Sequence, residues 1–164
     1  MVSWGFYLRH LRIPMSCQQL WVRRQRCSVC RTSHGILPSF MTFQRFDHVD
    51  VIGQGIEAMV AGRGSRPVAG ELDLPHSTVR DWRRRFRERS ELLAEGIAGA
   101  VVALTGSLPR LAADPERAAL EAMAAAWRAA AARGRVVGSA FFLANVICGS
   151  HLLSTNTHPP WAAA

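Results

Sequence analysis

The sequence predicts a mainly α-helical protein, and three observations lead to that prediction. Apolar residues recur at helical spacing on both sides of a short break at 73–75. Six of the ten residues from Arg80 to Arg89 are arginine. Beyond residue 90 the chain is rich in alanine, and its larger apolar residues again follow helical spacing. Together these patterns predict a helix-turn-helix three-helix unit, preceded by a short N-terminal β and zinc-knuckle remnant and followed by a C-terminal helical segment.

We expect the chain to divide into three regions. Residues 1–44 would form a basic arm with a degenerate CxxC knuckle, residues 45–90 the helix-turn-helix domain, and residues 91–164 a helical C-terminal region. Residues 1–90 contain 15 arginines and 7 acidic residues, a net charge of +8, whereas residues 91–164 contain five of each, a net charge of 0. The positive excess of the first half indicates a surface that binds a polyanion.

The N-terminal region combines arginine with apolar residues in no regular order. Its first 31 residues contain six arginines and no acidic residue, and their apolar residues follow no clear period. We therefore expect weak order before about Gln19. The segments 20–26 and 34–37 are then expected to be extended, with a turn after the second.

The tetrapeptide Cys27-Ser28-Val29-Cys30 is a CxxC knuckle, which can present two thiolates to one Zn²⁺. Tetrahedral zinc needs two further ligands, and no second CxxC follows. The nearby candidates are His10, Cys17 and His34, so a site made by Cys17, Cys27, Cys30 and His34 is one possibility. The alternative is a degenerate knuckle whose two reduced thiols bind no metal.

The first helix of the three-helix unit is expected to begin at Asp47, a good N-cap, and to stop at Gly62 and Gly64. Its apolar stripe consists of Val49, Ile52, Ile56, Met59 and Val60. The second helix would begin at Ser65 and end at the break at 73–75. The third would run from about Pro75 to Arg89.

The second and third helices have the residues that a helix-turn-helix needs at their crossing. Ala69 is small enough for the two helices to cross closely, and Leu74, Val79 and Trp82 would complete a small core. The turn often begins with glycine because its first residue requires a positive φ. Asp73 stands there in this chain, and aspartate tolerates that region better than most residues.

The third helix of such a unit enters the major groove of DNA, and here it is rich in arginine. Arg80, Arg84 and Arg87 share one face, and guanidinium groups pair with guanine or phosphate. We expect base-edge contacts from His76, Ser77, Arg80, Asp81 and Arg84, and backbone contacts from Arg83, Arg85 and Arg87. The alternative is an ordinary solvated charged face.

The C-terminal region is expected to form further helices. One would span 90–108 with Ser90 as its cap, and another 114–133, where Asp114 is followed by proline at the first helical position. Residues 136–153 are the most apolar stretch, but they are short for a membrane span, so we expect a buried helix or helix-turn. The tail 154–164 would be irregular.

The same residues argue against several classes of protein. The acidic residues after position 90 stand mostly at helix starts, and no nucleophile triad, phosphate loop or HExxH motif is present, so we predict a non-enzyme. Four scattered cysteines are too few for a disulfide framework, and the N-terminus is a poor signal peptide. We expect a cytoplasmic protein located at the nucleoid.

The segments CSVCRTSHGILPSF and FDHVDVIGQGIEAMVAGRGSRPVAGELDLPHSTVRDWRRRF resemble a family of short proteins from high-GC bacteria. That family is similar to the N-terminal part of insertion-sequence transposases, in which a zinc-ribbon-like knuckle precedes a helix-turn-helix. The closing ANVICGSHLLSTNTHPPW also resembles the family, so the similarity covers residues 21–161. It implies DNA binding and zinc at Cys27 and Cys30, although the other pair of ribbon ligands is missing here.

The sequence therefore predicts a protein that binds double-stranded DNA, either a transcriptional regulator or a transposase-derived module without a catalytic domain. A homodimer is possible, because helix-turn-helix proteins are often dimeric. The alternative hypothesis is a membrane-associated or protein-interaction module, in which the apolar segments 93–108 and 136–153 make the contacts.

Overall fold

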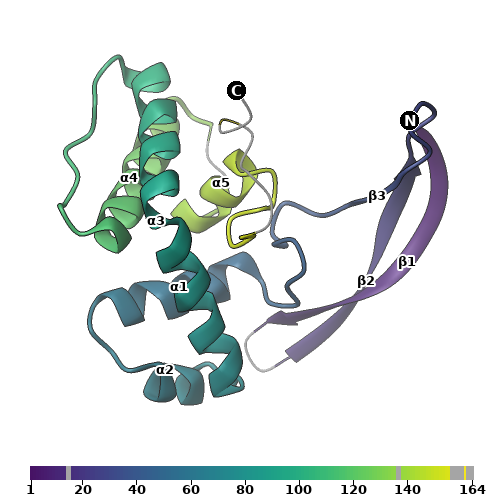
Figure 1. Cartoon of the computed structure of the whole chain (residues 1–164), viewed down its shortest axis with the longest axis horizontal. Coiled ribbons are helices and arrows are strands. Elements are labelled where there is room, and N and C mark those ends of the chain that lie inside the picture. Colours follow the sequence, from purple (N-terminus) through teal and green to yellow (C-terminus); the bar gives the residue numbers. More distant parts are fainter. Residues whose placement is uncertain (14–15, 136–137, 156–160, 162–164) are drawn as a thin grey trace.

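The protein has a mixed α/β fold, in which a three-stranded antiparallel sheet precedes five helices and about half of the chain is helical (Figure 1). The computed structural model describes residues 1–13, 16–135, 138–155 and 161. The strands, in the spatial order β1-β2-β3, are β1 (Val2–Ile13), β2 (Ser16–Arg26) and β3 (Ser33–Ile36). The helices are α1 (Val49–Val60), α2 (Ser65–Glu71), α3 (His76–Thr105), α4 (Pro115–Ala131) and α5 (Ala140–Ile147).

The prediction of weak order before Gln19 is wrong, because β1 and β2 pair along their whole length. Their register runs from Val2 opposite Arg26 to Ile13 opposite Ser16, with one irregularity between Ser3 and Phe6. The expected extended segment 20–26 lies within β2, and β3 covers residues 34–36 of the second one. The sequence hides β1 because its large apolar side chains are mostly exposed and because the irregularity shifts their alternation, so the period-2 signal of a half-buried strand is lost.

The three strands form a projection that we call the β arm, residues 2–36, with the N-terminus at its outer end (Figure 1). Its inner end is attached where the Arg12 N–H donates to the Phe46 carbonyl and the His48 N–H donates to the Arg12 carbonyl. The Arg12 guanidinium also lies 2.8 Å from the buried carboxylate of Asp47. Burial raises the pKa of Asp47, and the charge of Arg12 opposes that rise.

This ion pair explains why the expected N-cap of α1 is wrong. Asp47 is engaged with Arg12, and the cap is the next residue, His48, whose Nδ1 accepts from the Asp50 N–H at 3.2 Å. The apolar stripe of α1 packs into the core as expected, with Val49, Ile52, Ile56 and Met59 fully buried.

The crossing of α2 and α3 has the predicted small core. Ala69, Val79 and Trp82 are buried, and the partly buried Leu74 packs against them. Asp73 has a φ of 52°, so the turn uses aspartate in the left-handed region as the sequence indicated. Gly55 of α1 lies against the Trp82 ring, which leaves little room for a side chain at that position.

Helix α3 is one continuous helix of 30 residues, whereas two helices with a cap at Ser90 were expected. Ser90 lies inside the helix, where its hydroxyl donates to the Arg87 carbonyl. The buried residues of both halves lie on one stripe, which consists of Val79, Trp82, Phe86, Ser90, Leu93, Ile97 and Val101. Because this stripe has no interruption, the helix continues past residue 90 and ends at Gly106, which has a φ of 75°.

The C-terminal helices complete the same core. Asp114 caps α4 as predicted, accepting from the Arg117 N–H at 2.9 Å. Helix α5 lies in the apolar stretch expected to be buried, of which residues 136–137 are outside the described part, and Phe141, Leu152 and Leu153 are buried. Within the described residues, no helix is both long enough and apolar enough to cross a membrane.

Candidate nucleic-acid interface

The first turns of α3 carry the residues expected to contact bases. Ser77 and Arg80 are exposed, and Arg80 makes no ion pair with any described residue. His76 is different, because its Nε2 is hydrogen-bonded to the Ser65 hydroxyl at 2.9 Å. That bond joins the first residues of α2 and α3, so the His76 side chain holds the corner between these helices and is not free to point outward.

Asp81 is the centre of a cluster of ion pairs. Its carboxylate lies 2.9 Å from Arg85 and 2.9 Å from Arg45, and it also binds Arg84. Burial alone would raise the pKa of Asp81, but hydrogen bonds from Arg84 and Arg85 outweigh that effect and lower it. An anionic side chain enclosed by three guanidinium groups orients its neighbours and is poorly placed to accept from a base.

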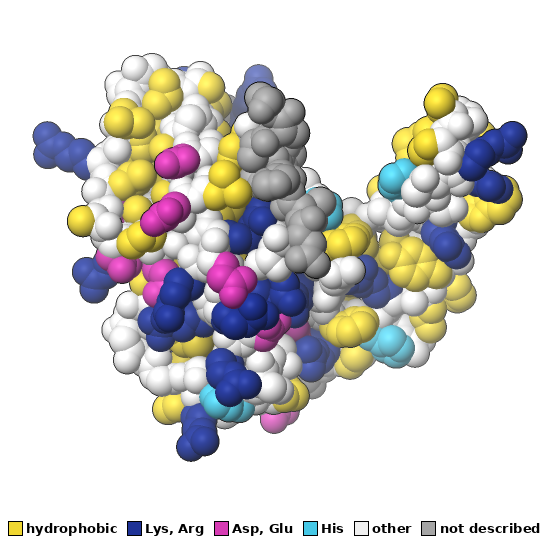
Figure 2. Space-filling view, in the orientation of Figure 1, with side chains coloured by type: hydrophobic (Ala, Val, Ile, Leu, Met, Phe, Trp, Pro, Cys, Tyr) yellow, Lys and Arg dark blue, Asp and Glu magenta, His cyan; other side chains and the backbone are white. Residues whose placement is uncertain are grey.

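Glu116, in the first turn of α4, holds two of the arginines expected to contact the DNA backbone. Its carboxylate lies 3.4 Å from the Arg83 guanidinium and 3.7 Å from that of Arg87. Glu88 lies 2.8 Å from Arg84 in the same helix. Figure 2 shows arginine and acidic side chains next to one another in the middle of this face of the molecule. Much of the positive charge of α3 is therefore balanced within the protein.

The arginines of α3 also differ in exposure. Arg80, Arg84 and Arg87 are exposed, in agreement with their predicted common face, and with Arg83 they line a depression of about 350 Å³. Arg83 and Arg85 are half-buried. The sixth arginine, Arg89, is buried, donates to the Ser154 carbonyl, and has its pKa lowered by desolvation. It belongs to the core and not to the exposed face.

The β arm lies next to the start of α3. A depression of about 300 Å³ separates them, lined by Arg12, Gln44, Arg45, Phe46, Asp47, Ser77, Thr78 and Asp81. Residues 1–44 contain six arginines and no acidic residue, a net charge of +6, whereas residues 45–90 contain nine and seven, a net charge of +2. Sequence reasoning identified residues 1–44 as a basic arm but assigned the base and phosphate contacts to α3 alone, although no acidic residue stands in the first 46 positions of the chain.

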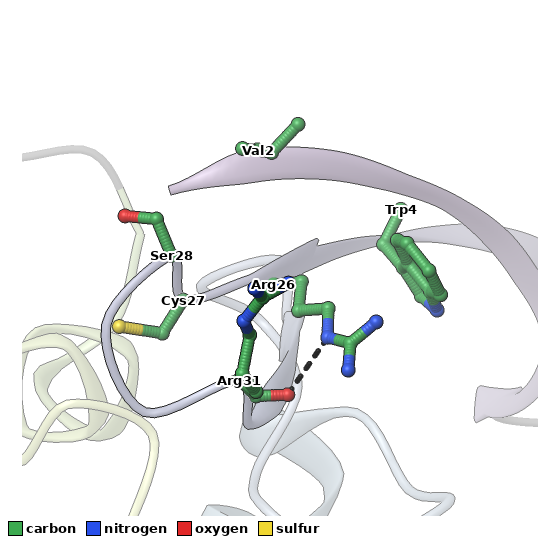
Figure 3. A pocket seen from close by; sticks show the side chains of 6 residues that line it. All are labelled: Val2, Trp4, Arg26, Cys27, Ser28 and Arg31. Atoms are coloured by element: carbon green, nitrogen blue, oxygen red, sulfur yellow. Dashed lines mark hydrogen bonds between the residues drawn. The ribbon is translucent and has the colours of Figure 1, made fainter.

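The CxxC knuckle lies at the outer end of the arm, beside a pocket of about 340 Å³ formed with Val2, Trp4, Arg26, Ser28 and Arg31 (Figure 3). The turn is closed by a hydrogen bond from the Arg31 N–H to the Cys27 carbonyl, 3.1 Å long. Hydrogen bonding by Thr32 lowers the pKa of the exposed Cys30 thiol. The knuckle therefore presents two thiols, and hydrogen bonding makes the thiol of Cys30 readier to ionise than an ordinary cysteine.

The described residues do not complete a zinc site at this knuckle. No group of three His, Cys, Asp or Glu side chains comes together in the described part of the chain. Cys17 lies near the opposite end of β2 from Cys27, a separation of about 30 Å at 3.3 Å per residue. The thiol of Cys17 is instead 3.8 Å from Nδ1 of His10. The four-ligand site considered from sequence, with Cys17 and His34, is therefore excluded within one chain.

No protein-family model, curated protein or solved structure shows significant similarity to this chain. The interface must therefore be interpreted from its own geometry.

Proposed function

We propose that the protein binds double-stranded DNA through α2 and α3, as a transcriptional regulator or a transposase-derived module without a catalytic domain. The observation that carries this proposal is the corner between the two helices. Ala69, Val79 and Trp82 are buried there, and Asp73 has the left-handed backbone of a helix-turn-helix turn. This arrangement exposes the start of α3, which is the part of a recognition helix that contacts base edges.

The ion pairs refine the contacts expected from sequence. Ser77, Arg80 and Arg84 are the exposed candidates for base edges, and Arg80 leads them because no described carboxylate competes for it. Arg87 reaches the backbone from the same face. A phosphate has to displace Glu116 before it can bind Arg83, and it has to displace Asp81 before it can bind Arg85. These two arginines therefore contribute less to DNA affinity.

The alternative of a membrane-associated or protein-interaction module has less support. Many of the apolar residues on which it depended are inside the body, including Leu93, Ile97, Val101, Phe141, Leu152 and Leu153, although Val102, Leu108 and Val146 are exposed. Buried side chains supply no apolar surface for a membrane or a partner. DNA binding would place the protein at the nucleoid, and a homodimer would read two half-sites, as is common for this motif.

Selection of bound duplexes from a random library tests the proposal. Wild-type protein should enrich a sequence preference, and its affinity should fall steeply with salt. Arg80→Ala should relax the preference at one position by about 1–3 kcal/mol. Arg128→Ala is the matched control, because it removes the same charge from an exposed position in the last turn of α4. If wild type and Arg80→Ala enriched the same duplex sequences to the same extent, the proposal would be refuted.

A further inference from the structure

The β arm carries positive charge that the protein itself does not balance. The carboxylate nearest to it in sequence, Asp47, pairs with Arg12 at the inner end. Among the described residues, no ion pair engages Arg9, Arg23, Arg24, Arg26 or Arg31. Two of these donate only to backbone carbonyls, Arg9 to Arg45 and Arg26 to Arg31. An element with this charge attracts a polyanion.

One face of the arm is apolar where a sheet in water is normally polar. In the register of the strands, Leu8 lies opposite Trp21, and Arg23 lies between Phe6 and Ile36, so these five side chains share a face. Trp21 is 71% exposed and Phe6 is 61% exposed. The other face carries the buried Leu11 and Val22. We call the exposed set of Phe6, Leu8, Trp21, Arg23 and Ile36 the outer face of the arm.

Guanidinium groups and aromatic rings also lie together on the arm. Arg26 lies over the ring of Trp4 at 4.6 Å, and Arg24 lies over Tyr7 at 5.8 Å. Such stacking orients a guanidinium group while its N–H groups remain available to an anion. Arg24 and Arg26 lie on the opposite face of β2 from Trp21 and Arg23, so they add to the positive charge of the arm without covering the rings of the outer face.

We propose that the outer face of the β arm binds single-stranded nucleic acid. Trp21 and Phe6 stack on bases, and Arg23, on the same face, holds a phosphate. Phosphate charge matches an arm without carboxylates, and uncovered rings match bases that are not already stacked on neighbours. A duplex presents phosphates but keeps its base faces inside the stack, so it does not use the rings.

A second copy of the chain would fit this face less well. Two arms packed face to face would bring the two Arg23 guanidinium groups together, within elements that each contain six arginines and no carboxylate. Repulsion between like charges opposes that contact, whereas a polyanion relieves it. The proposal does not depend on the helix-turn-helix function, because it involves different residues and a different form of nucleic acid.

Fluorescence anisotropy of the full chain with a labelled oligothymidine of about 12 nucleotides tests this inference. Trp21→Ala should weaken binding about 5- to 150-fold, the usual effect of losing one base–ring stack. Trp21→Phe should retain most of the affinity. Leu108→Ala is the matched control, because Leu108 is also a highly exposed apolar residue but follows the end of α3. Circular dichroism should show the same fold for all variants, since Trp21 supports no core.

Salt dependence and competition complete the test. Arg23→Ala should reduce the slope of log affinity against log salt by about 0.7, the value for one phosphate on a single strand. Arg80→Ala should weaken duplex binding while leaving oligothymidine binding unchanged, which separates this proposal from the previous one. Three results would each overturn it: no binding of oligothymidine, equal affinity of wild type and Trp21→Ala, or equal competition by a duplex. If Trp21→Ala instead turned a dimer into a monomer at unchanged affinity, the face would be a self-association surface.

Discussion

The β arm and helix α3 use the same side chain, arginine, in opposite ways. On α3, the carboxylates of Asp81, Glu88 and Glu116 hold every exposed or half-buried guanidinium group except that of Arg80. On the arm, arginines outside the inner end contact rings and carbonyls. A count of arginines therefore overstates the charge that α3 offers to a ligand and understates the share of unpaired charge that the arm carries. The difference teaches that the charge a surface offers to a ligand has to be counted after its internal ion pairs are subtracted.

The two regions also differ in how their cysteines should react, and this is the largest expected effect. In the body, burial raises the pKa of Cys148 to about 12, although the charge of Arg89 opposes the rise. At pH 8 its thiolate fraction is on the order of 10⁻⁴. On the arm, Cys30 is exposed and its pKa is lowered. Iodoacetamide followed by peptide mass mapping should label Cys30 first and Cys148 only after denaturation. Labelling of Cys148 at the rate of Cys30 in native protein would contradict this comparison.

A pair of tryptophan substitutions sharpens the contrast in packing. Trp82 is fully buried against Gly55 in the corner between α2 and α3, whereas Trp21 is mostly exposed on the arm. Trp82→Ala should lower the free energy of unfolding by about 3–5 kcal/mol, because it leaves a large cavity. Trp21→Ala should change it by less than about 0.5 kcal/mol. Urea denaturation followed by circular dichroism measures both, and similar losses would refute the assignment of the core.

The sequence was informative where structure is local. Periodicity located the corner of α2 and α3, the chemistry of aspartate identified Asp73 as the left-handed residue, and Asp114 marked the start of α4. These features depend on residues within a few positions of one another, so they can be predicted from a short window.

Three of the errors involve partners that are distant in sequence. Asp47 is not the cap because Arg12, 35 residues earlier, holds it. Arg83 is not free because Glu116, 33 residues later, pairs with it. Ser90 starts no helix because α4 packs along the continuous stripe of α3. Strand β1 was missed because most of its large apolar residues face water, which removes the burial pattern that marks a strand.

The next prediction concerns the internal carboxylate that restrains α3. Glu116→Gln removes the charge that holds Arg83 and Arg87, so both guanidinium groups become available to phosphates. Duplex affinity at low salt should rise several-fold, and the salt slope should steepen by up to about 1.8, or 0.9 for each of two phosphates. Stability should fall by about 1 kcal/mol or less, since both arginines are partly exposed.

Anisotropy titrations at several salt concentrations measure this change. Glu95→Gln is the control, because it removes the same charge from an exposed position of α3 that has no ion pair among the described residues. An equal rise in duplex affinity for Glu95→Gln would mean that the net charge of the protein, and not the release of Arg83 and Arg87, controls affinity. A fall in affinity for Glu116→Gln would show that Glu116 positions the two arginines for binding.

The smallest expected effect is the pH dependence of the Asp81 cluster. Hydrogen bonds from Arg84 and Arg85 outweigh burial and lower the pKa of Asp81, so the folded protein binds this proton less tightly than the unfolded chain does. Asp81 therefore stabilises the fold above the unfolded value of about 4, and that contribution is lost as pH falls through the folded value. Asp81→Asn should cost about 1 kcal/mol or less at pH 7 and almost nothing near pH 2. Urea midpoints of wild type and Asp81→Asn at the two pH values test this. If the stability lost by Asp81→Asn grew toward acid pH, the pKa of Asp81 would be raised, and burial would prevail over the three arginines.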